Sequence, residues 1–158
     1  MLKLLGCALT VICAALWGFE KSADVKKEAE FTFAVMGLVK RTGEEIATLC
    51  CPLPDIFSSY NDEILSESGF MNEVRTAGFS DALKNHKNSF PPSVLEILEP
   101  FAKRLGAGDR EEQTALCKRT YMHLCDEYEK ISEKLPERTK MIKVMPPLCV
   151  LCAVILII

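Results

Sequence analysis

The chain has 158 residues and a formal net charge of −3, with 49% hydrophobic and 26% charged residues. This length allows one domain with a substantial core and is too short for two large ones. The slightly acidic balance argues against a generic nucleic-acid binder, which normally presents a basic face. Mean hydropathy is +0.13 despite the many charges, so we expect the apolar residues to be concentrated in separate segments.

Two apolar segments lie at the ends of the chain. Residues 2–19 carry one charge, Lys3, and residues 144–158 carry none. Both are shorter than the ~20 residues that span a bilayer comfortably, but local thinning of the bilayer and snorkelling of flanking side chains can make up such a difference. We predict transmembrane helices at 1–19 and 144–158, which leaves residues 20–143 as a helical domain.

An alternative is that residues 1–19 form a cleaved signal peptide, since a charged start precedes an apolar centre. The chain would then be an exported, disulfide-bonded helical protein. Small residues are required three positions before and immediately before the cleavage site. The pairs Gly18 with Glu20 and Lys21 with Ala23 fit this requirement poorly, which favours an uncleaved anchor.

Basic residues near the two apolar segments predict the orientation of the domain. Lysine and arginine close to membrane ends favour the cytoplasmic side. On the domain side of the two segments, the basic residues are Lys21, Lys26, Lys27, Lys134, Arg138, Lys140 and Lys143. The sequence therefore predicts a cytoplasmic domain with both termini on the opposite side of the membrane.

The eight cysteines do not form a recognisable metal or disulfide framework. Four lie in the apolar ends, where thiols behave as small hydrophobic groups. The others are Cys50, Cys51, Cys117 and Cys125, and a cytoplasmic domain keeps them reduced. Neither the adjacent pair nor the eight-residue step is typical zinc-ligand spacing, so we expect no metal and no cofactor.

Helical periodicity dominates residues 22–105. A first helix is expected from a cap at Ser22 to Leu49. Shorter helices are expected at 55–65, at 67–77, from a cap at Ser80, and at 93–105, with Pro100 as a kink. The apolar positions expected to be buried are Val25, Ala29, Phe33, Met36, Val39, Ile46, Ile56, Tyr60, Ile64, Phe70, Val74, Ala77, Leu95, Leu98, Phe101, Ala102 and Leu105.

The last helix is expected to begin after Asp109 and to run to about Leu135, where Pro136 marks a kink or break. Its apolar stripe has near-heptad spacing and comprises Leu116, Leu124, Tyr128, Ile131 and Leu135. We predict an all-α fold: a helical bundle with a long antiparallel helical hairpin, first helix against last, flanked by N- and C-terminal transmembrane helices.

The octet GAGDREEQ at 106–113 lies between the last two predicted helices. It lacks the lysine of a P-loop and the third glycine of a dinucleotide-binding turn. It fits a turn in which Gly106 adopts a left-handed conformation and Asp109 caps the next helix, with Glu112 completing a capping box. Gln113 is unexplained by this interpretation; it either bonds to a neighbouring helix or faces water.

No constellation predicts catalysis, because His86 and His123 are far apart with no ligand or triad spacing. Four basic residues cluster around the octet: Arg104, Arg110, Lys118 and Arg119. They either meet an acidic partner or form an ordinary solvated helix face.

The sequence resembles the stage III sporulation protein AB family. The resemblance rests on LGAGDREEQ at 105–113, on the long helix that follows, on EEIATLCCPLPDIF at 44–57, on the opening MLKLLG and on the two terminal anchors. It covers essentially the whole chain. The pattern Leu-Gly-x-x-Asp-Arg-x-x-Gln is its most specific part. Cys50-Cys51, Pro136 and Pro146-Pro147 depart from it.

The resemblance implies a non-enzymatic component of the channel between mother cell and forespore, in the mother-cell side of the engulfing membrane. Its domain would be similar to F-type platform proteins of type II secretion systems. The implied partners are a cytoplasmic secretion-type ATPase, stage III sporulation protein AA, and other channel proteins. Gly106, Asp109, Arg110 and Gln113 match the signature, which implies importance for the fold and a partner surface, with no catalytic role.

Overall fold

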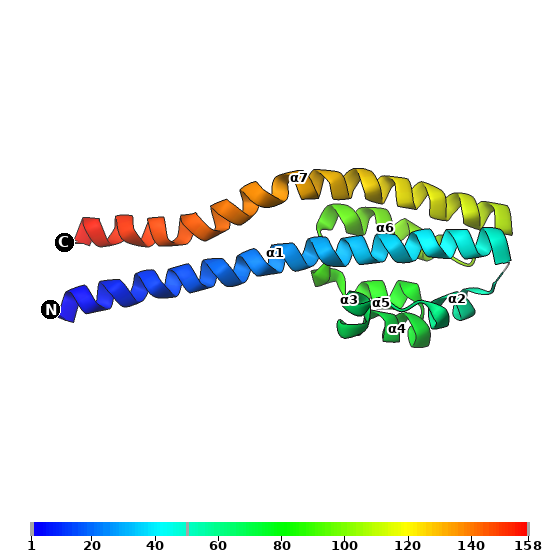
Figure 1. The fold of residues 1–158 in the computed structure, drawn as a ribbon, viewed down its shortest axis with the longest axis horizontal. Helices are drawn as coiled ribbons and strands as arrows, with labels where there is room; N and C mark the ends of the chain where they lie inside the picture. The colour runs from blue at the N-terminus through cyan, green and yellow to red at the C-terminus, as the bar shows by residue number, and fades with distance from the viewer. Residues whose placement is uncertain (1, 50, 158) are drawn as a thin grey trace. The chain divides into compact units, whose positions relative to one another are not determined.

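The computed structural model describes the backbone of residues 2–49 and 51–157 and the side chains of residues 22–49 and 51–142. Every regular element in these residues is helical, which confirms the predicted all-α fold class (Figure 1). In chain order the elements are α1 (Leu2–Leu49), α2 (Leu53–Ser59), α3 (Glu63–Glu67), α4 (Phe70–Ala77), α5 (Phe79–Asn85), the 3₁₀ helix η1 (Lys87–Ser89), α6 (Pro92–Arg104) and α7 (Arg110–Ile157).

The chain divides into two compact units, residues 28–130 and residues 1–27 with 131–158. The described backbone of the second unit is helical. Among the described residues, no helix is long and apolar enough to cross a membrane. The side chains of the two predicted anchors, 1–19 and 144–158, lie outside the described residues.

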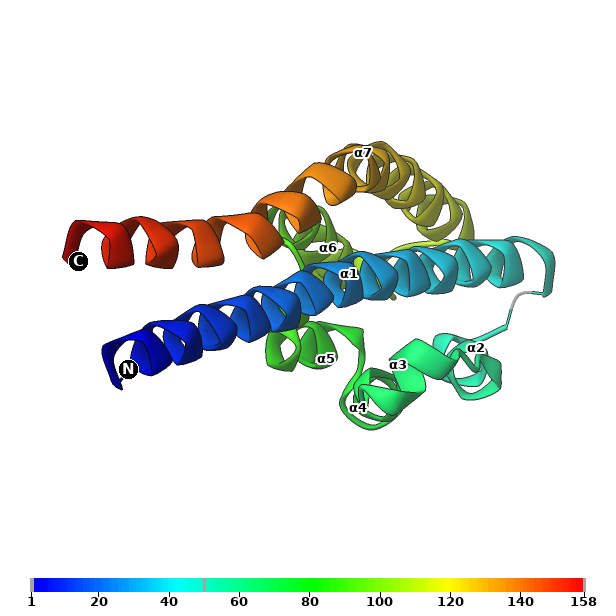
Figure 2. The same cartoon turned by 60° about the vertical axis from the view of Figure 1, so that its left-hand side comes forward.

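In the 28–130 unit, α1 and α7 pack against each other in opposite directions. Three contacts mark the register: Phe33 with Tyr128 at 5.4 Å between ring centroids, Met36 with Cys125 at 3.6 Å between sulfur atoms, and Lys40 with Tyr121 at 5.8 Å from the ammonium to the ring centroid. Each step forward along α1 meets a step backward along α7, as expected for the predicted antiparallel hairpin. Figure 1 and Figure 2 show α2–α5 along the other side of this part of α1.

Aromatic side chains form the core between α1 and the short helices. The ring of Phe70 is fully buried and meets the rings of Phe31, Phe79 and Phe90 edge-on, with centroids 5.6, 5.8 and 6.1 Å apart. Such pairs contribute ~0.5–1.5 kcal/mol each beyond the area they bury. Because Phe31 lies on α1 and Phe79 on α5, this cluster fixes the short helices to the hairpin.

Half of the predicted core positions are buried. Those confirmed are Ala29, Met36, Val39, Ile46, Ile56, Phe70, Val74, Leu98, Phe101, Ala102 and Leu124. Val25, Tyr60, Leu95, Leu105, Leu116, Tyr128, Ile131 and Leu135 are half-buried. The prediction is wrong for Phe33, which is 54% exposed, for Ile64, which is 38% exposed, and for Ala77. Leu65 fills the core position expected for Ile64. The reason is that a new helix begins just before these two residues, so its buried face does not continue the pattern of the preceding helix.

The helix predicted at 55–65 is two helices, α2 and α3. Tyr60 is extended after α2, and the carboxylate of Asp62 caps α3 by accepting from the N–H of Leu65 at 3.1 Å. A side chain that bonds to the backbone three residues later starts a helix at that point. The sequence pattern missed this cap because the apolar spacing continues across it.

Other predicted helix ends are also wrong. Ser80 is not a cap, because α5 begins at Phe79 after Gly78, whose φ is +90°. Ser22 lies inside α1 rather than at the start of a helix. α7 continues through Pro136, so the predicted break is absent. Proline removes one helical hydrogen bond, and the long runs of helix on both sides of Pro136 retain theirs.

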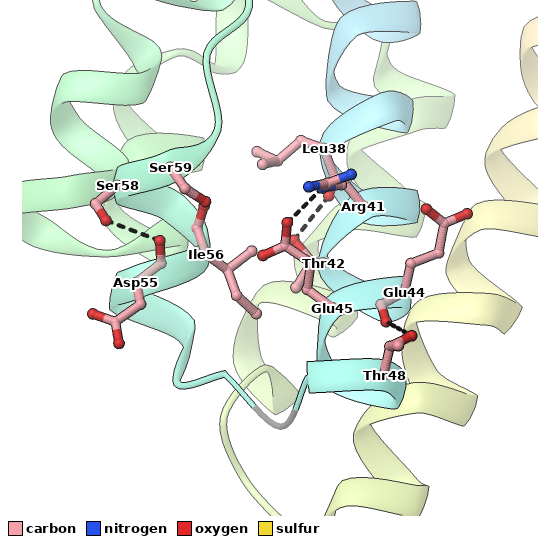
Figure 3. A network of polar contacts seen from close by, with 10 residues as sticks. All are labelled: Leu38, Arg41, Thr42, Glu44, Glu45, Thr48, Asp55, Ile56, Ser58 and Ser59. Atoms are coloured by element: carbon pink, nitrogen blue, oxygen red, sulfur yellow. Dashed lines mark hydrogen bonds and ion pairs between the residues drawn. The ribbon is translucent and has the colours of Figure 1, made fainter.

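Polar side chains on the second half of α1 find partners on the same helix (Figure 3). The hydroxyl of Thr42 donates to the carbonyl of Leu38 at 2.8 Å, and the buried carboxylate of Glu45 pairs with Arg41. Burying a charge without a partner is strongly unfavourable. These groups are therefore satisfied within α1 and need no external ligand.

α1 and α7 approach each other closely at Gly43. A Cβ atom placed on Gly43 would lie 2.8 Å from the Cβ of Cys117. Atoms do not approach this closely without displacement, so the glycine sets the distance between the two helices.

We predict that Gly43→Ala lowers the free energy of unfolding by about 1–3 kcal/mol through overpacking, although alanine is a better helix former by ~1 kcal/mol. Combining it with Cys117→Gly removes the clashing atom, so the double variant should be more stable than the two single effects predict. The measurement is urea denaturation of the full chain in detergent, monitored by circular dichroism. Strict additivity of the two changes would show that the helices do not touch at this point.

Candidate functional site

The octet predicted to be a turn forms the corner between α6 and α7. Gly106 and Gly108 have φ angles of +83° and +104°. Glycine adopts this left-handed region without the steric cost that other residues incur. Gly106 follows the C-cap of α6, Leu105, which confirms its predicted role in ending that helix.

Asp109 begins α7 as predicted. Its Oδ1 accepts from the backbone N–H of Glu112 at 2.8 Å, which satisfies one of the donors that a helix start leaves unpaired. The capping box is only half formed among the described residues, since the Glu112 carboxylate bonds to no backbone N–H there. That carboxylate folds over Gly108, where an added Cβ would lie 2.3 Å from its Oε2.

The side chain of Gln113 forms hydrogen bonds with backbone groups of the corner. Its Oε1 accepts from the N–H of Gly106 at 2.9 Å, and its Nε2 donates to the carbonyls of Arg104, at 3.1 Å, and Ala107. The residue is buried, at 7% exposure. A single amide therefore bonds to one donor and two acceptors where α6 ends, and the carbonyl of Arg104 also accepts from the N–H of Ala107 at 3.1 Å. Of the two alternatives for this residue, a bond to a neighbouring helix is confirmed, because Arg104 is the last residue of α6. Its other two bonds go to the turn that follows.

Arg110 reaches α1, 64 positions earlier in the chain. Its Nε donates to the carbonyl of Ile46 at 3.0 Å, and its Nη2 donates to that of Ala47. Both carbonyls belong to the last turn of α1, the part of a helix whose carbonyls run out of helical partners. A cation at a helix C-terminus also interacts favourably with the helix dipole. The sequence could not reveal this contact, because no local pattern links residues so far apart.

The corner encloses a cavity of about 380 Å³. Four signature residues, Gly106, Asp109, Arg110 and Gln113, line it from the α7 side. The wall opposite is formed by the loop and first turn of α2: Cys51, Pro52, Leu53 and Pro54. The structure thus brings together residues of the two motifs that carry the family resemblance, at 44–57 and 105–113.

The predicted basic cluster divides into separate parts. Arg110 is used at the corner, whereas Arg104 and Arg119 line a second cavity, of about 390 Å³, between α6 and α7. Lys118 is exposed and lines neither of these cavities. Only Arg104 and Arg119 therefore share a surface that a partner could contact.

Reactive chemistry is not indicated at the corner. Asp109, Glu111 and Glu112 are all exposed, and the described residues contain no group of three metal-ligating side chains. Burial raises the pKa of the nearby Cys117 thiol to about 11, so the thiol stays protonated near neutral pH and is a poor nucleophile. The bonds at the corner hold backbone groups, as structural residues do.

We predict that Gln113→Glu destabilises the chain despite its nearly identical shape. A carboxylate can still accept from Gly106, but it has no N–H for the carbonyls of Arg104 and Ala107. The Arg104 carbonyl keeps its bond from the N–H of Ala107, whereas the Ala107 carbonyl loses the bond from Gln113, and an unsatisfied polar group costs about 1–3 kcal/mol. Thermal unfolding of the full chain in detergent measures the loss. The control is Glu111→Gln, an exposed neighbour that should change stability by less than about 0.5 kcal/mol. Equal midpoints for Gln113→Glu and wild type would contradict the proposed bonding.

Comparisons with known proteins agree with the resemblance seen in the sequence. The sequence model of the stage III sporulation protein AB family matches residues 3–158, which includes the whole corner and both terminal segments. No curated protein and no solved structure matches the chain significantly. The chain belongs to the stage III sporulation protein AB family and is a sporulation protein.

Proposed function

We propose that this protein is a non-enzymatic membrane platform in the channel between mother cell and forespore, and that it couples a cytoplasmic ATPase to the membrane assembly. The observation that carries the proposal is that the two helices of the hairpin, α1 and α7, are also the helices that contain the apolar ends of the chain. Family membership supplies the context of sporulation.

The two apolar ends act as membrane anchors in this proposal. Residues 2–19 and 144–158 contain a single charge between them. No irregular linker separates either segment from the helical hairpin, because α1 begins at Leu2 and α7 ends at Ile157. A domain held at both ends of one hairpin has fewer orientations available than a domain on one flexible tether.

In this proposal the domain faces the cytoplasm of the mother cell, because lysines and arginines near both apolar ends favour the cytoplasmic side of the membrane. The partner is the secretion-type ATPase that the family resemblance implies, stage III sporulation protein AA. Satisfied backbone and side-chain groups at the corner between α6 and α7 favour a rigid support rather than a catalytic centre.

The experiment that tests the proposal is flotation of the purified ATPase with vesicles that carry the full-length chain. We expect the ATPase to float with these vesicles and to stay at the bottom of the gradient with empty vesicles. The chain itself should resist alkaline carbonate extraction, because its apolar ends reside in hydrocarbon.

The matched control is a chain that lacks residues 144–158, and it is extracted by carbonate to a greater extent if both ends are anchors. Complete release of the full-length chain by carbonate would overturn the anchoring. An ATPase that remains at the bottom with loaded vesicles would overturn the coupling.

A further inference from the structure

We infer that the groove between α6 and α7 is a docking site for an acidic, amphipathic helical segment of a partner protein. The inference deepens the proposed function, because it assigns the coupling to one surface of the domain. It rests on the shape of the groove, on the unpaired charges at its rim and on the opposite charge of the rest of the domain.

The floor of the groove is apolar and lies open to a ligand. The cavity of about 390 Å³ is bounded by Ile97, Pro100 and Phe101 of α6 and by Leu116 of α7. Its volume falls within the ~300–1,000 Å³ typical of ligand sites. A depression between two helices that is lined by apolar side chains can receive the apolar face of a third helix.

The rim carries two arginines that have no partner. Of the five arginines in residues 28–130, Arg41 pairs with a carboxylate, and Arg75 and Arg110 donate to backbone carbonyls. In the part of the chain that the structure describes, the side chains of Arg104 and Arg119 make no hydrogen bond or ion pair. Arginine is enriched at protein interfaces, where its planar guanidinium binds carboxylates in bidentate fashion.

The net negative charge of the surrounding domain directs an acidic partner toward these arginines. Residues 28–130 contain 18 aspartates and glutamates against 11 lysines and arginines. Two of those 11, Arg104 and Arg119, line the groove. An acidic partner is repelled by most of this domain and attracted at the groove, which steers its approach. Glu96 is the one carboxylate on the groove lining, and it favours a partner with separated rather than continuous charges.

Two features of α6 prepare the groove. The carbonyl of Arg104 is held by Gln113, which fixes the backbone from which this arginine projects. Pro100, inside α6, has no N–H, so the carbonyl of Glu96 lacks its usual helical partner and is an acceptor at the groove. The corner is therefore a support for the docking surface rather than the surface itself.

The test is fluorescence anisotropy with the full chain in detergent and a labelled synthetic helix of roughly 18 residues, with leucine on one face and glutamate on the other. We expect the acidic peptide to bind, and binding to weaken as salt is raised. Arg104→Glu combined with Arg119→Glu should lower affinity at least about tenfold, and the milder Arg104→Gln with Arg119→Gln should lower it less. Circular dichroism confirms that each variant is folded.

The charge-matched control is Lys84→Glu with Lys130→Glu, which changes exposed lysines elsewhere and should leave affinity within about twofold. Absence of peptide binding, or equal affinity for the arginine-reversed variant, would overturn the inference. So would a groove variant whose only defect is loss of self-association, since the occupant would then be a second copy. Running the ATPase flotation with the same variants separates the two proposals: failure with wild type overturns the coupling, whereas equal flotation with the arginine-reversed variant overturns only the groove.

Discussion

The contact between Arg110 and the end of α1 is the constraint on which the rest of the 28–130 unit depends. α1 ends before a segment that contains Pro52 and Pro54, so its last carbonyls have no helix to continue into. The guanidinium of Arg110 supplies partners for Ile46 and Ala47. Because Arg110 is also the first residue of α7, the end of one long helix is bonded directly to the start of the other.

This end-to-start bond fixes the register of the hairpin. Once residue 110 lies beside residue 46, the close approach of Gly43 to Cys117 and the tilted ring contact of Phe33 with Tyr128 follow at helical steps. The same device occurs at α2, where Arg75 of α4 donates to the carbonyls of Phe57 and Tyr60. In both cases an arginine closes a helix C-terminus that the chain leaves by a sharp turn, and side-chain capping replaces backbone continuity.

Periodicity alone predicted the helical class, the antiparallel hairpin and about half of the buried positions, because a 3.6-residue pattern reports directly on the buried face of a helix. It failed where a single side chain decides the outcome. Asp62 divides one predicted helix into two, and α7 passes through Pro136, where a break was expected. The roles of Gly106 and Asp109 were predictable because turns and caps are local. Those of Arg110 and Gln113 were not, since they depend on which carbonyls the fold brings within reach.

In and around the signature region, the residues that hold the fold together differ from those proposed to bind a partner. The side chains of Asp109, Arg110 and Gln113 form hydrogen bonds with backbone groups of the protein, including the N–H of Gly106, so these residues hold the corner. Arg104 and Arg119, which no motif distinguishes, keep their charges available at the groove between α6 and α7. A platform that transmits position needs both: a rigid corner between its long helices and a surface beside it for the partner.

Hydrogen exchange at the last turn of α1 tests the central contact most directly. In the full chain in detergent, the amides of residues 46–49 should exchange roughly 10- to 100-fold faster in Arg110→Met than in wild type, since hydrogen bonds to a charged group contribute ~1.5–3 kcal/mol. Lys118→Met, a change of the same type on an exposed residue of α7, should leave their exchange unaltered. Identical exchange of these amides in wild type and Arg110→Met would show that the arginine does not hold the end of α1.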